Sequence, residues 1–197
     1  LNEIYLGQSE LVITGGVDTL NDILMFMCFS KTTALSPTND CRPFSDKADG
    51  TMLGEGIGMV ALKLLDAAER DGDRIYAVIK GLGSSSDGRA KSIYAPVSEG
   101  QARALRRAYE HAEYSPETVE LVEAHGTGTK AGDAAEFEGL RMIFDQETER
   151  SDHQWCALGS VKSQVGRTKA AAGSAGLFKI LMALHHKVLP PTIKVDA

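Results

Sequence analysis

Short apolar runs alternate with helical patterns along the chain. Residues 10–17 (ELVITGGV) and 58–65 (GMVALKLL) are nearly continuous apolar runs, which are typical of buried strands. Residues 74–82 alternate enough to predict a third strand. Two later runs, one ending at His125 and one spanning 155–161, predict a fourth and a fifth strand. Strands separated by helices in this way predict an α/β protein with a parallel or mixed sheet covered on both faces.

The intervals between these runs divide into helices and loops. Residues 1–8 resemble the last turns of a helix without a cap in front of them, and the first residue is not Met, so we expect the chain to be a fragment. Residues 18–29 have no clear period and are interpreted as irregular. A stretch rich in Ser, Thr, Pro and Asn predicts a loop at 30–40, a Ser- and Gly-containing stretch one at 84–92, and a charged stretch one at 146–154.

Ser98 is predicted to cap a helix whose apolar positions are spaced three, four and three residues apart, at Ala102, Leu105, Tyr109 and Ala112. The opposite face of this helix carries Arg103, Arg106, Arg107 and Glu110. A basic cluster on a helix is more often a solvated face than a phosphate-binding one, and we interpret it so.

Two further helices are predicted in the C-terminal half. Asp133, with Glu136 three residues on, predicts a capping box, and Phe137, Leu140 and Phe144 mark the buried face that follows. The last helix is expected to open near Thr168 and to end before Pro190. Its first turns are rich in alanine and glycine, which allow close packing against neighbouring backbone.

Composition limits the classes of function. The 197 residues are 43% hydrophobic and 24% charged with a formal charge of −6, as expected for one soluble globular unit or most of one. No run of charge or long apolar stretch suggests binding to nucleic acid or to a membrane, and we expect a cytoplasmic protein. The cysteines Cys28, Cys41 and Cys156 are widely spaced, without metal-ligand spacing, and are interpreted as reduced thiols; no metal site is expected.

Residues 122–130 (VEAHGTGTK) carry the clearest candidate chemistry. His125 lies where a strand meets a tight loop, and the alternating glycines and threonines leave room for a thioester or carbonyl to approach the imidazole. A glycine-rich turn with a half-buried, hydrogen-bonded histidine explains the pattern equally well. The motif alone does not separate the two interpretations.

A second motif, residues 159–168 (GSVKSQVGRT), lies at another predicted strand end and contains Lys162 and Arg167. Cationic groups facing an imidazole would stabilise a developing oxyanion, which weakly supports acyl chemistry. The two side chains could equally be solvated, or could pair with the carboxylates of Glu123, Asp133 or Glu136.

Taken together, these motifs resemble those of β-ketoacyl synthases. VEAHGTGTKAGDAAEFEGL and GSVKSQVGRTKAAAGSAGLFKILMALHHKVLPPTI are similar to the family's two histidine-bearing motifs, and CRPFSDKADGTMLGEGIGMVALK to its mid-domain signature, in the family's order. The resemblance covers essentially the whole chain. In detail it is closest to ketosynthase domains of large type I synthases that make polyketides and polyunsaturated fatty acids.

The resemblance implies a thiolase-like fold of α-β-α-β-α layers, here truncated at both ends. Residues 1–70 would form the end of its N-terminal half and residues 71–197 most of its C-terminal half. The family usually forms homodimers, so a homodimer is expected for the intact domain.

The resemblance also implies a reaction. A cysteine takes an acyl chain from the phosphopantetheine of an acyl carrier protein, a malonyl thioester is decarboxylated, and the enolate attacks the acyl-cysteine to give a 3-oxoacyl product. By position, His125 matches the first catalytic histidine and Lys162 the lysine, while Thr127 and Thr129 match the threonines beside the pantetheine arm. No cofactor is expected to bind directly, since the carrier protein presents its own phosphopantetheine.

Two departures from the family pattern matter. The family's nucleophilic cysteine would precede Leu1, and none of the three cysteines present should inherit its role, because Cys28 and Cys156 are expected in apolar surroundings and Cys41 belongs to a different motif. Arg167 occupies the position of the second histidine. Arginine can donate hydrogen bonds to an oxyanion but is bulkier and stays charged.

Three functions therefore remain open. The favoured one is a ketosynthase fragment that belongs to a condensing enzyme and has no activity on its own. The alternative is a non-catalytic, chain-length-factor type of ketosynthase-like subunit, which Arg167 favours and His125 and Lys162 oppose. Thiolase chemistry on coenzyme A esters shares the fold but not these motifs.

Overall fold

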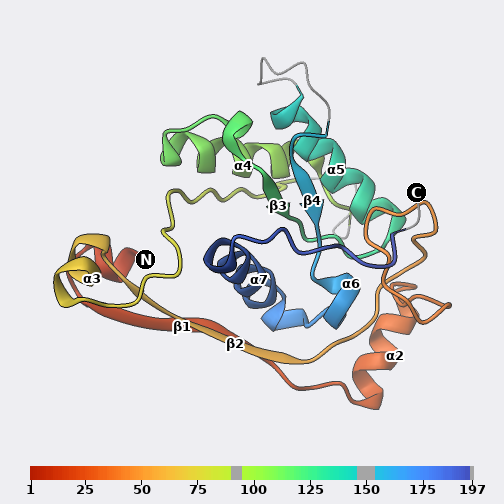
Figure 1. Cartoon of the computed structure of the whole chain (residues 1–197). Helices are drawn as coiled ribbons and strands as arrows, with labels where there is room; N and C mark the ends of the chain where they lie inside the picture. Colours follow the sequence, from red (N-terminus) through yellow and green to blue (C-terminus); the bar gives the residue numbers. More distant parts are fainter. Residues whose placement is uncertain (90–94, 146–153, 196–197) are drawn as a thin grey trace.

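The computed structural model describes residues 1–89, 95–145 and 154–195. Figure 1 shows helix α7 (Ala172–His186) between two pairs of strands, with α4 (Ser98–Ala112) and α5 (Lys130–Phe144) on the far side of the second pair. The arrangement is therefore layered, as the resemblance implies. In the described residues the strands form two separate pairs rather than the one sheet covered on both faces that the pattern predicts. Among the described residues, none of the helices is long and apolar enough to cross a membrane.

The first pair of strands is an antiparallel ribbon. β1 (Leu11–Asp18) pairs with β2 (Gly56–Lys63) along its whole length. One face of the ribbon packs against α7 so closely that a Cβ atom at Gly58 would lie 2.7 Å from the Cβ of Ser174. The other face exposes between 51% and 67% of each of its large apolar side chains, which are Leu11, Ile13, Val17, Ile57 and Met59. Both strands are confirmed, although the second begins and ends two residues earlier than predicted.

The second pair brings the candidate chemistry together. β3 (Leu121–Glu123) runs parallel to β4 (Ala157–Gly159). The carboxyl ends of parallel strands meet at one edge, so the loop after β3 lies beside α6 (Lys162–Val165), the short helix that follows β4. Both strands are confirmed but are shorter than the apolar runs that predict them.

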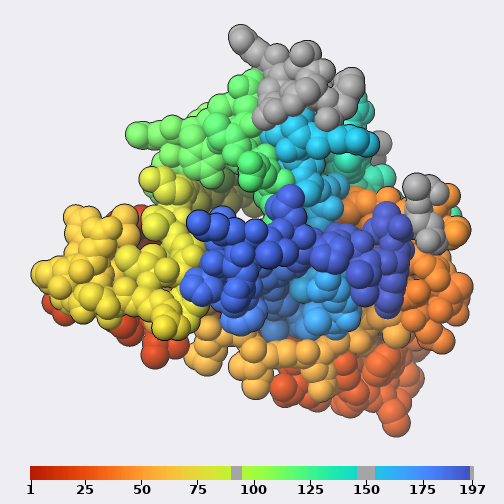
Figure 2. Space-filling model, viewed as in Figure 1, coloured from red at the N-terminus to blue at the C-terminus, as the bar shows by residue number. Residues whose placement is uncertain are grey.

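The predicted strand at 74–82 is wrong. This segment is extended, but no ladder partner is assigned to it within the described ranges. Gly81 within it and Gly83 just after it pack on α4 instead, and its Tyr76 ring centroid lies 5.0 Å from that of His185 on α7 (Figure 2, where the yellow segment borders the blue helix). Alternating apolar and polar residues indicate an extended segment with two different sides. In this segment those sides contact helices instead of neighbouring strands.

The interpretation of residues 18–29 as irregular is also wrong. Helix α2 (Ile23–Lys31) begins there, and its N-cap Asp22 accepts a hydrogen bond from the backbone N–H of Met25 at 2.9 Å. The helix is apolar almost all round, so the polar face by which a surface helix is recognised is missing. Cys28 is exposed on it, which corrects the expectation of apolar surroundings.

Other differences lie at helix ends. α1 (Asn2–Tyr5) confirms the N-terminal helix, and α3 (Leu65–Asp71) follows β2. Val97 is the N-cap of α4, one residue before the predicted Ser98, and Thr129 is the N-cap of α5, so the predicted cap at Asp133 is wrong. Phe137 is 49% exposed rather than buried.

Two short 3₁₀ helices complete the fold, at η1 (Pro116–Thr118) and η2 (Lys169–Ala171), the latter opening α7 close to the predicted start. The predicted loops at 84–92 and 146–154 lie partly outside the described residues, which omit 90–94 and 146–153.

Packing of the extended segment on α4 can be tested at Gly83. A Cβ atom there would lie 1.9 Å from the carbonyl oxygen of Ala104, and backbone atoms cannot give way cheaply. We expect Gly83→Ala to lower the free energy of unfolding of the chain by about 1–3 kcal/mol, measured by urea denaturation. Gly173→Ala is the matched control, since no atom lies within 4 Å of its built Cβ, and it should raise that energy by about 0.4–1 kcal/mol. Equal stabilities would contradict the packing.

Candidate active site

The loop after β3 is held by side chains of α5. The carboxylate of Glu136 accepts hydrogen bonds from two successive backbone N–H groups, that of His125 at 2.6 Å and that of Gly126 at 2.7 Å. Gly126 has φ of +37°, in the region that favours glycine. The backbone on both sides of the histidine is therefore fixed by one side chain.

Asp133 continues the same arrangement one helical turn earlier. Its carboxylate accepts from the N–H of Thr127 at 2.9 Å, from that of Gly128 at 3.2 Å and, from a distant loop, from that of Phe44 at 2.8 Å. Burial raises the pKa of this carboxyl group and that of Glu136, while the backbone N–H donors oppose the rise. The capping-box spacing was the available sequence signal, because it places both carboxylates on one face of the first turns of α5.

Lys162 supports the loop from the opposite strand. It begins α6, is 3% exposed, and its Nζ donates to the carbonyl oxygen of His125 at 2.5 Å. Burial lowers the pKa of Lys162, and the nearby charge of Arg167 lowers it further. In the described part of the chain this ammonium forms no salt bridge, so the ion pair considered with Glu123, Asp133 or Glu136 is not observed.

Arg167 contacts the imidazole directly. Its Nη1 lies 2.9 Å from the Nε2 of His125. A guanidinium only donates hydrogen bonds, so Nε2 must be the acceptor and the ring proton of a neutral His125 must sit on Nδ1. The backbone of Arg167 is fixed on both sides, by a hydrogen bond from its N–H to the carbonyl of Met52 and one to its carbonyl from the N–H of Gly54. The Nε atom of Arg167 is buried and finds no acceptor among the described residues.

The surroundings keep His125 neutral. Burial of the ring, followed by the positive charges of Lys162 and Arg167, lowers the pKa of His125 from 6.5 to about 4. The residue as a whole is nevertheless exposed to solvent, so the burial is that of the part of the ring facing Lys162 and Arg167. At neutral pH the site therefore combines an uncharged imidazole with two cations, which suits it to stabilise a negatively charged oxygen.

The two threonines and the nearest cysteine lie around the same loop. The Oγ1 atoms of Thr127 and Thr129 are 2.8 Å apart. Cys41 is 1% exposed, its Sγ lies 3.4 Å from the carbonyl oxygen of Thr127, and burial raises the pKa of its thiol. A buried thiol with a raised pKa is poorly suited to act as a nucleophile.

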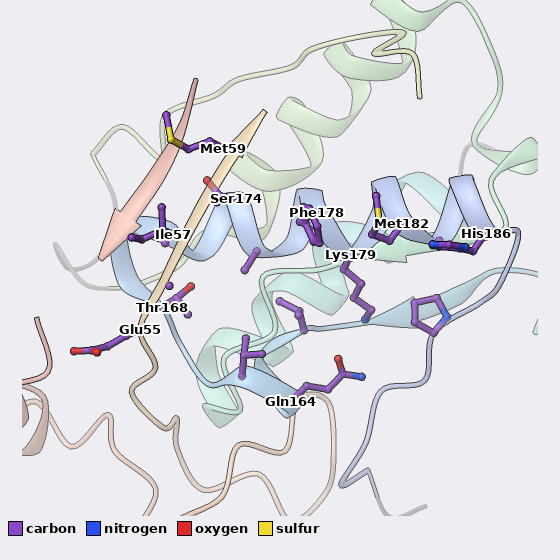
Figure 3. Close-up of a pocket in the computed structure, with 18 of the residues that line it drawn as sticks. Glu55, Ile57, Met59, Gln164, Thr168, Ser174, Phe178, Lys179, Met182 and His186 are labelled. Carbon is purple, nitrogen blue, oxygen red and sulfur yellow. The ribbon is translucent and has the colours of Figure 1, made fainter. Parts of the chain in front are cut away.

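Two hollows border the site. One, of about 340 Å³, is lined by His125 and Lys162 and by the first turns of α7. The larger, of about 810 Å³, is a mostly apolar groove between β2 and α7 and includes Phe178 and Met182 (Figure 3). His125 does not line this groove, so the smaller hollow is the one associated with the candidate chemistry.

Comparisons with known proteins identify the family. Residues 1–68 match the family model described as Beta-ketoacyl synthase, N-terminal domain, and residues 76–196 match the one described as Beta-ketoacyl synthase, C-terminal domain. The chain belongs to the β-ketoacyl synthase family. The resemblance inferred from the motifs is thereby confirmed.

Individual relatives point to multidomain synthases. The chain is 48% identical over 196 residues to a polyunsaturated fatty acid synthase protein of Thraustochytrium, covering 100% of this chain and 7% of that protein. The ketosynthase from module 6 of the bacillaene synthase of Bacillus subtilis 168 has a TM-score of 0.94 and 38% identity, over 100% of this chain and 35% of that one. A PfaC keto synthase–chain length factor has a TM-score of 0.92 and 35% identity, over 99% and 21%.

The likeness to these structures confirms the thiolase-like layered fold. The chain spans well under half the length of each of these relatives. The structure brings His125, Lys162 and Arg167 together and places Thr127 and Thr129 on the same loop, while their roles remain predictions.

The support from α5 is testable by Glu136→Gln. An amide keeps one acceptor but turns an N–H group toward the second backbone N–H, which leaves that donor unsatisfied. We expect the free energy of unfolding to fall by about 1–3 kcal/mol in urea denaturation. Glu138→Gln on the same helix removes only an exposed ion pair with Arg141 and should change it by less than about 1 kcal/mol. Similar losses of unfolding free energy in both variants would show that the hydrogen bonds from Glu136 do not stabilise the loop more than an exposed ion pair does.

The neutral state of His125 predicts a pH dependence of stability. Its folded-state pKa of about 4 lies below the ordinary 6.5, so between these values the unfolded chain binds a proton that the folded chain excludes. The contribution is present above pH 6.5 and is lost as the pH falls toward 4. We expect the free energy of unfolding to fall more steeply across this window in the wild type than in His125→Gln. Parallel curves would contradict the lowered pKa.

Proposed function

We propose that these residues form the carbonyl-activating part of a β-ketoacyl-[acyl-carrier-protein] synthase, an acyltransferase that elongates an acyl chain in fatty acid or polyketide biosynthesis. The observation that carries the proposal is the convergence of His125, Lys162 and Arg167 at one edge of β3 and β4. His125 directly contacts Lys162, 37 positions away in sequence, and Arg167, 42 positions away. Membership of the family supports the same reaction.

The proposed reaction is a decarboxylative Claisen condensation. The bond between the malonyl carboxylate and its neighbouring carbon breaks, carbon dioxide leaves, and the electron pair forms an enolate with its charge on the thioester oxygen. The enolate carbon attacks the carbonyl of an acyl-cysteine, forms the new carbon–carbon bond and expels the cysteine thiolate. The product is a 3-oxoacyl thioester.

Each site residue has a role in this scheme. The cations of Lys162 and Arg167 lend positive charge to the enolate oxygen, since charge is most effective where solvent is partly excluded. The guanidinium also inhibits the reaction, because it occupies the Nε2 of His125 that would otherwise be free to act on the thioester. Lys162 also holds the backbone of His125 in place. Thr127 and Thr129 are proposed to lie beside the phosphopantetheine arm of the carrier protein, whose hydroxyl and amide groups can bond with threonine hydroxyls.

The nucleophile in this scheme is none of the three cysteines of the sequence. Cys41 is buried against Thr127, and burial raises the pKa of the thiol of Cys156. Cys28 lies on α2, on an element that does not carry the loop of His125. We therefore expect these 197 residues alone not to condense, and the activity to belong to the complete protein that its gene encodes.

The remaining proposals concern substrates, assembly and location. We propose that the complete protein takes malonyl and acyl thioesters from an acyl carrier protein, acts as a homodimer and works in the cytoplasm. No cofactor would bind directly, because the carrier protein brings the phosphopantetheine.

A non-catalytic, chain-length-factor type of role is the second candidate. The contact of Arg167 with the Nε2 of His125 favours it, because that nitrogen cannot then donate a hydrogen bond to a thioester oxygen while the ring is neutral. The likeness to a keto synthase–chain length factor is compatible with it.

Arg167→His separates the two candidates. A second imidazole in place of the guanidinium frees the Nε2 of His125 and adds a neutral hydrogen-bond donor. One well-placed donor to a developing oxyanion is worth about 100- to 1,000-fold in rate. We expect 3-oxoacyl formation by the complete protein to rise by that order in the variant, measured with malonyl and acyl carrier-protein thioesters. Arg141→His on the exposed side of α5 is the control and should leave the rate unchanged. Equal rates for wild type and Arg167→His would overturn the proposed inhibition, and absence of product in both would favour the non-catalytic role.

A further inference from the structure

A buried ion pair lies directly behind the site. Glu123, the last residue of β3, and Lys179, in the middle of α7, have side chains that are 7% and 6% exposed, with Glu123 Oε2 and Lys179 Nζ 2.7 Å apart. Figure 3 shows Lys179 leaving α7 in a different direction from Phe178 and Met182. The two atoms are within ion-pair distance, although neither makes a hydrogen bond of good geometry among the described residues. Charges removed from water in this way are costly unless each has a partner.

The carboxylate of Glu123 has a second contact. Its Oε1 accepts a hydrogen bond from the backbone N–H of Val161 at 2.5 Å. Val161 is the N-cap of α6 and immediately precedes Lys162, whose ammonium reaches the carbonyl of His125. Glu123 is itself only two residues before His125. The Glu123 side chain thus joins the end of β3 to the start of α6. The separation of these two segments sets the distance from Lys162 to the His125 loop.

The surrounding backbone leaves room for this pair. A Cβ atom at Gly159 would lie 2.9 Å from the Nζ of Lys179, and one at Gly176 would lie 3.2 Å from the Cγ of Glu123. Next to the pair, the N–H of Ser160 donates to the hydroxyl of Thr192 at 3.2 Å. The pair therefore occupies a fitted space between β3, β4 and α7.

We propose that the Glu123–Lys179 ion pair is a positioning element of the site, which holds Val161 and so sets Lys162 against the His125 loop. This inference rests on the proposed function for its catalytic consequence. Glu123 lines the smaller hollow, but within the described ranges no hydrogen bond or ion pair joins either residue to the imidazole or to Arg167, so both act through Val161 and Lys162. Lys179 holds the Glu123 carboxylate in the orientation that reaches Val161, and without that cation the buried carboxylate has no salt-bridge partner among the described residues.

Three variants of the complete protein test the pair. Lys179→Met leaves the carboxylate without its cation, and Glu123→Gln keeps an acceptor for Val161 but turns an amide N–H toward the ammonium. The double variant Glu123→Gln/Lys179→Met removes both charges and keeps the acceptor. Lys187→Met, at the exposed end of α7, is the matched control.

The first readout is the decarboxylation of a malonyl carrier-protein thioester, which needs no acyl-cysteine. We expect each single variant to lower kcat by up to about 100-fold, the loss typical of a small misplacement of a catalytic group, with KM nearly unchanged. The double variant should recover most of kcat. Single variants with wild-type kcat, or a double variant no better than either single one, would overturn the proposal.

The second readout does not depend on activity. Acetylation of lysine amines, followed by peptide mass spectrometry, should find Lys162 protected in the wild type and in Lys187→Met, and exposed in each single variant. Lys169 is paired with Asp18, with Nζ and Oδ1 3.0 Å apart, and is not part of the Glu123–Lys179 pair. It therefore reports general unfolding and should stay protected in every variant. If neither the wild type nor any variant decarboxylates the thioester, the proposed function fails, but the labelling still tests the positioning role. Exposure of Lys162 without exposure of Lys169 in the single variants supports that role, and continued protection of Lys162 overturns it.

Discussion

Four consecutive backbone N–H groups, those of residues 125–128, have no strand to pair with, because β3 ends at Glu123. The molecule satisfies all four with two carboxylates on successive turns of α5. Unpaired buried donors are costly, so the loop can hold its shape only while Asp133 and Glu136 stay in place. The position of the imidazole, and every contact made with it, depends on this constraint.

Around that fixed loop the negative and positive charges lie on opposite sides. Two carboxylates lie on the α5 side and bind backbone, while Lys162 and Arg167 approach from the β4 side. The ring between them is kept uncharged by burial and by the two cations. A neutral ring next to two fixed cations is an environment for a developing anion, and the arginine is also the group that occupies the ring nitrogen.

Much of this arrangement could be predicted from sequence. The strands ending near His125 and Gly159 follow from apolar runs, and parallel pairing then brings His125 and Lys162 to one edge. The motifs themselves identify the family. Sequence also located Asp133 and Glu136, but as a helix cap, because a capping box and a pair of carboxylates aimed at a neighbouring loop have the same spacing.

Other features depend on tertiary contacts that leave no local pattern. The segment at 74–82 has the alternation of a strand, yet it packs on α4 through Gly81 and the neighbouring Gly83 and joins no ladder among the described residues. Helix α2 has no polar face and therefore no helical period. The bond from Arg167 to the Nε2 of His125, and the pairing of Glu123 with Lys179, join residues more than 40 positions apart.

Burial of the ring, together with the charges of Lys162 and Arg167, holds His125 neutral, and the guanidinium engages its Nε2. The most direct test is the proton affinity of His125, measured from the pH dependence of its carbethoxylation, a reaction of the neutral imidazole, with peptide-level mass spectrometry of the complete protein. The account predicts a midpoint near pH 4. A midpoint near 6.5, the ordinary value for histidine, would contradict it.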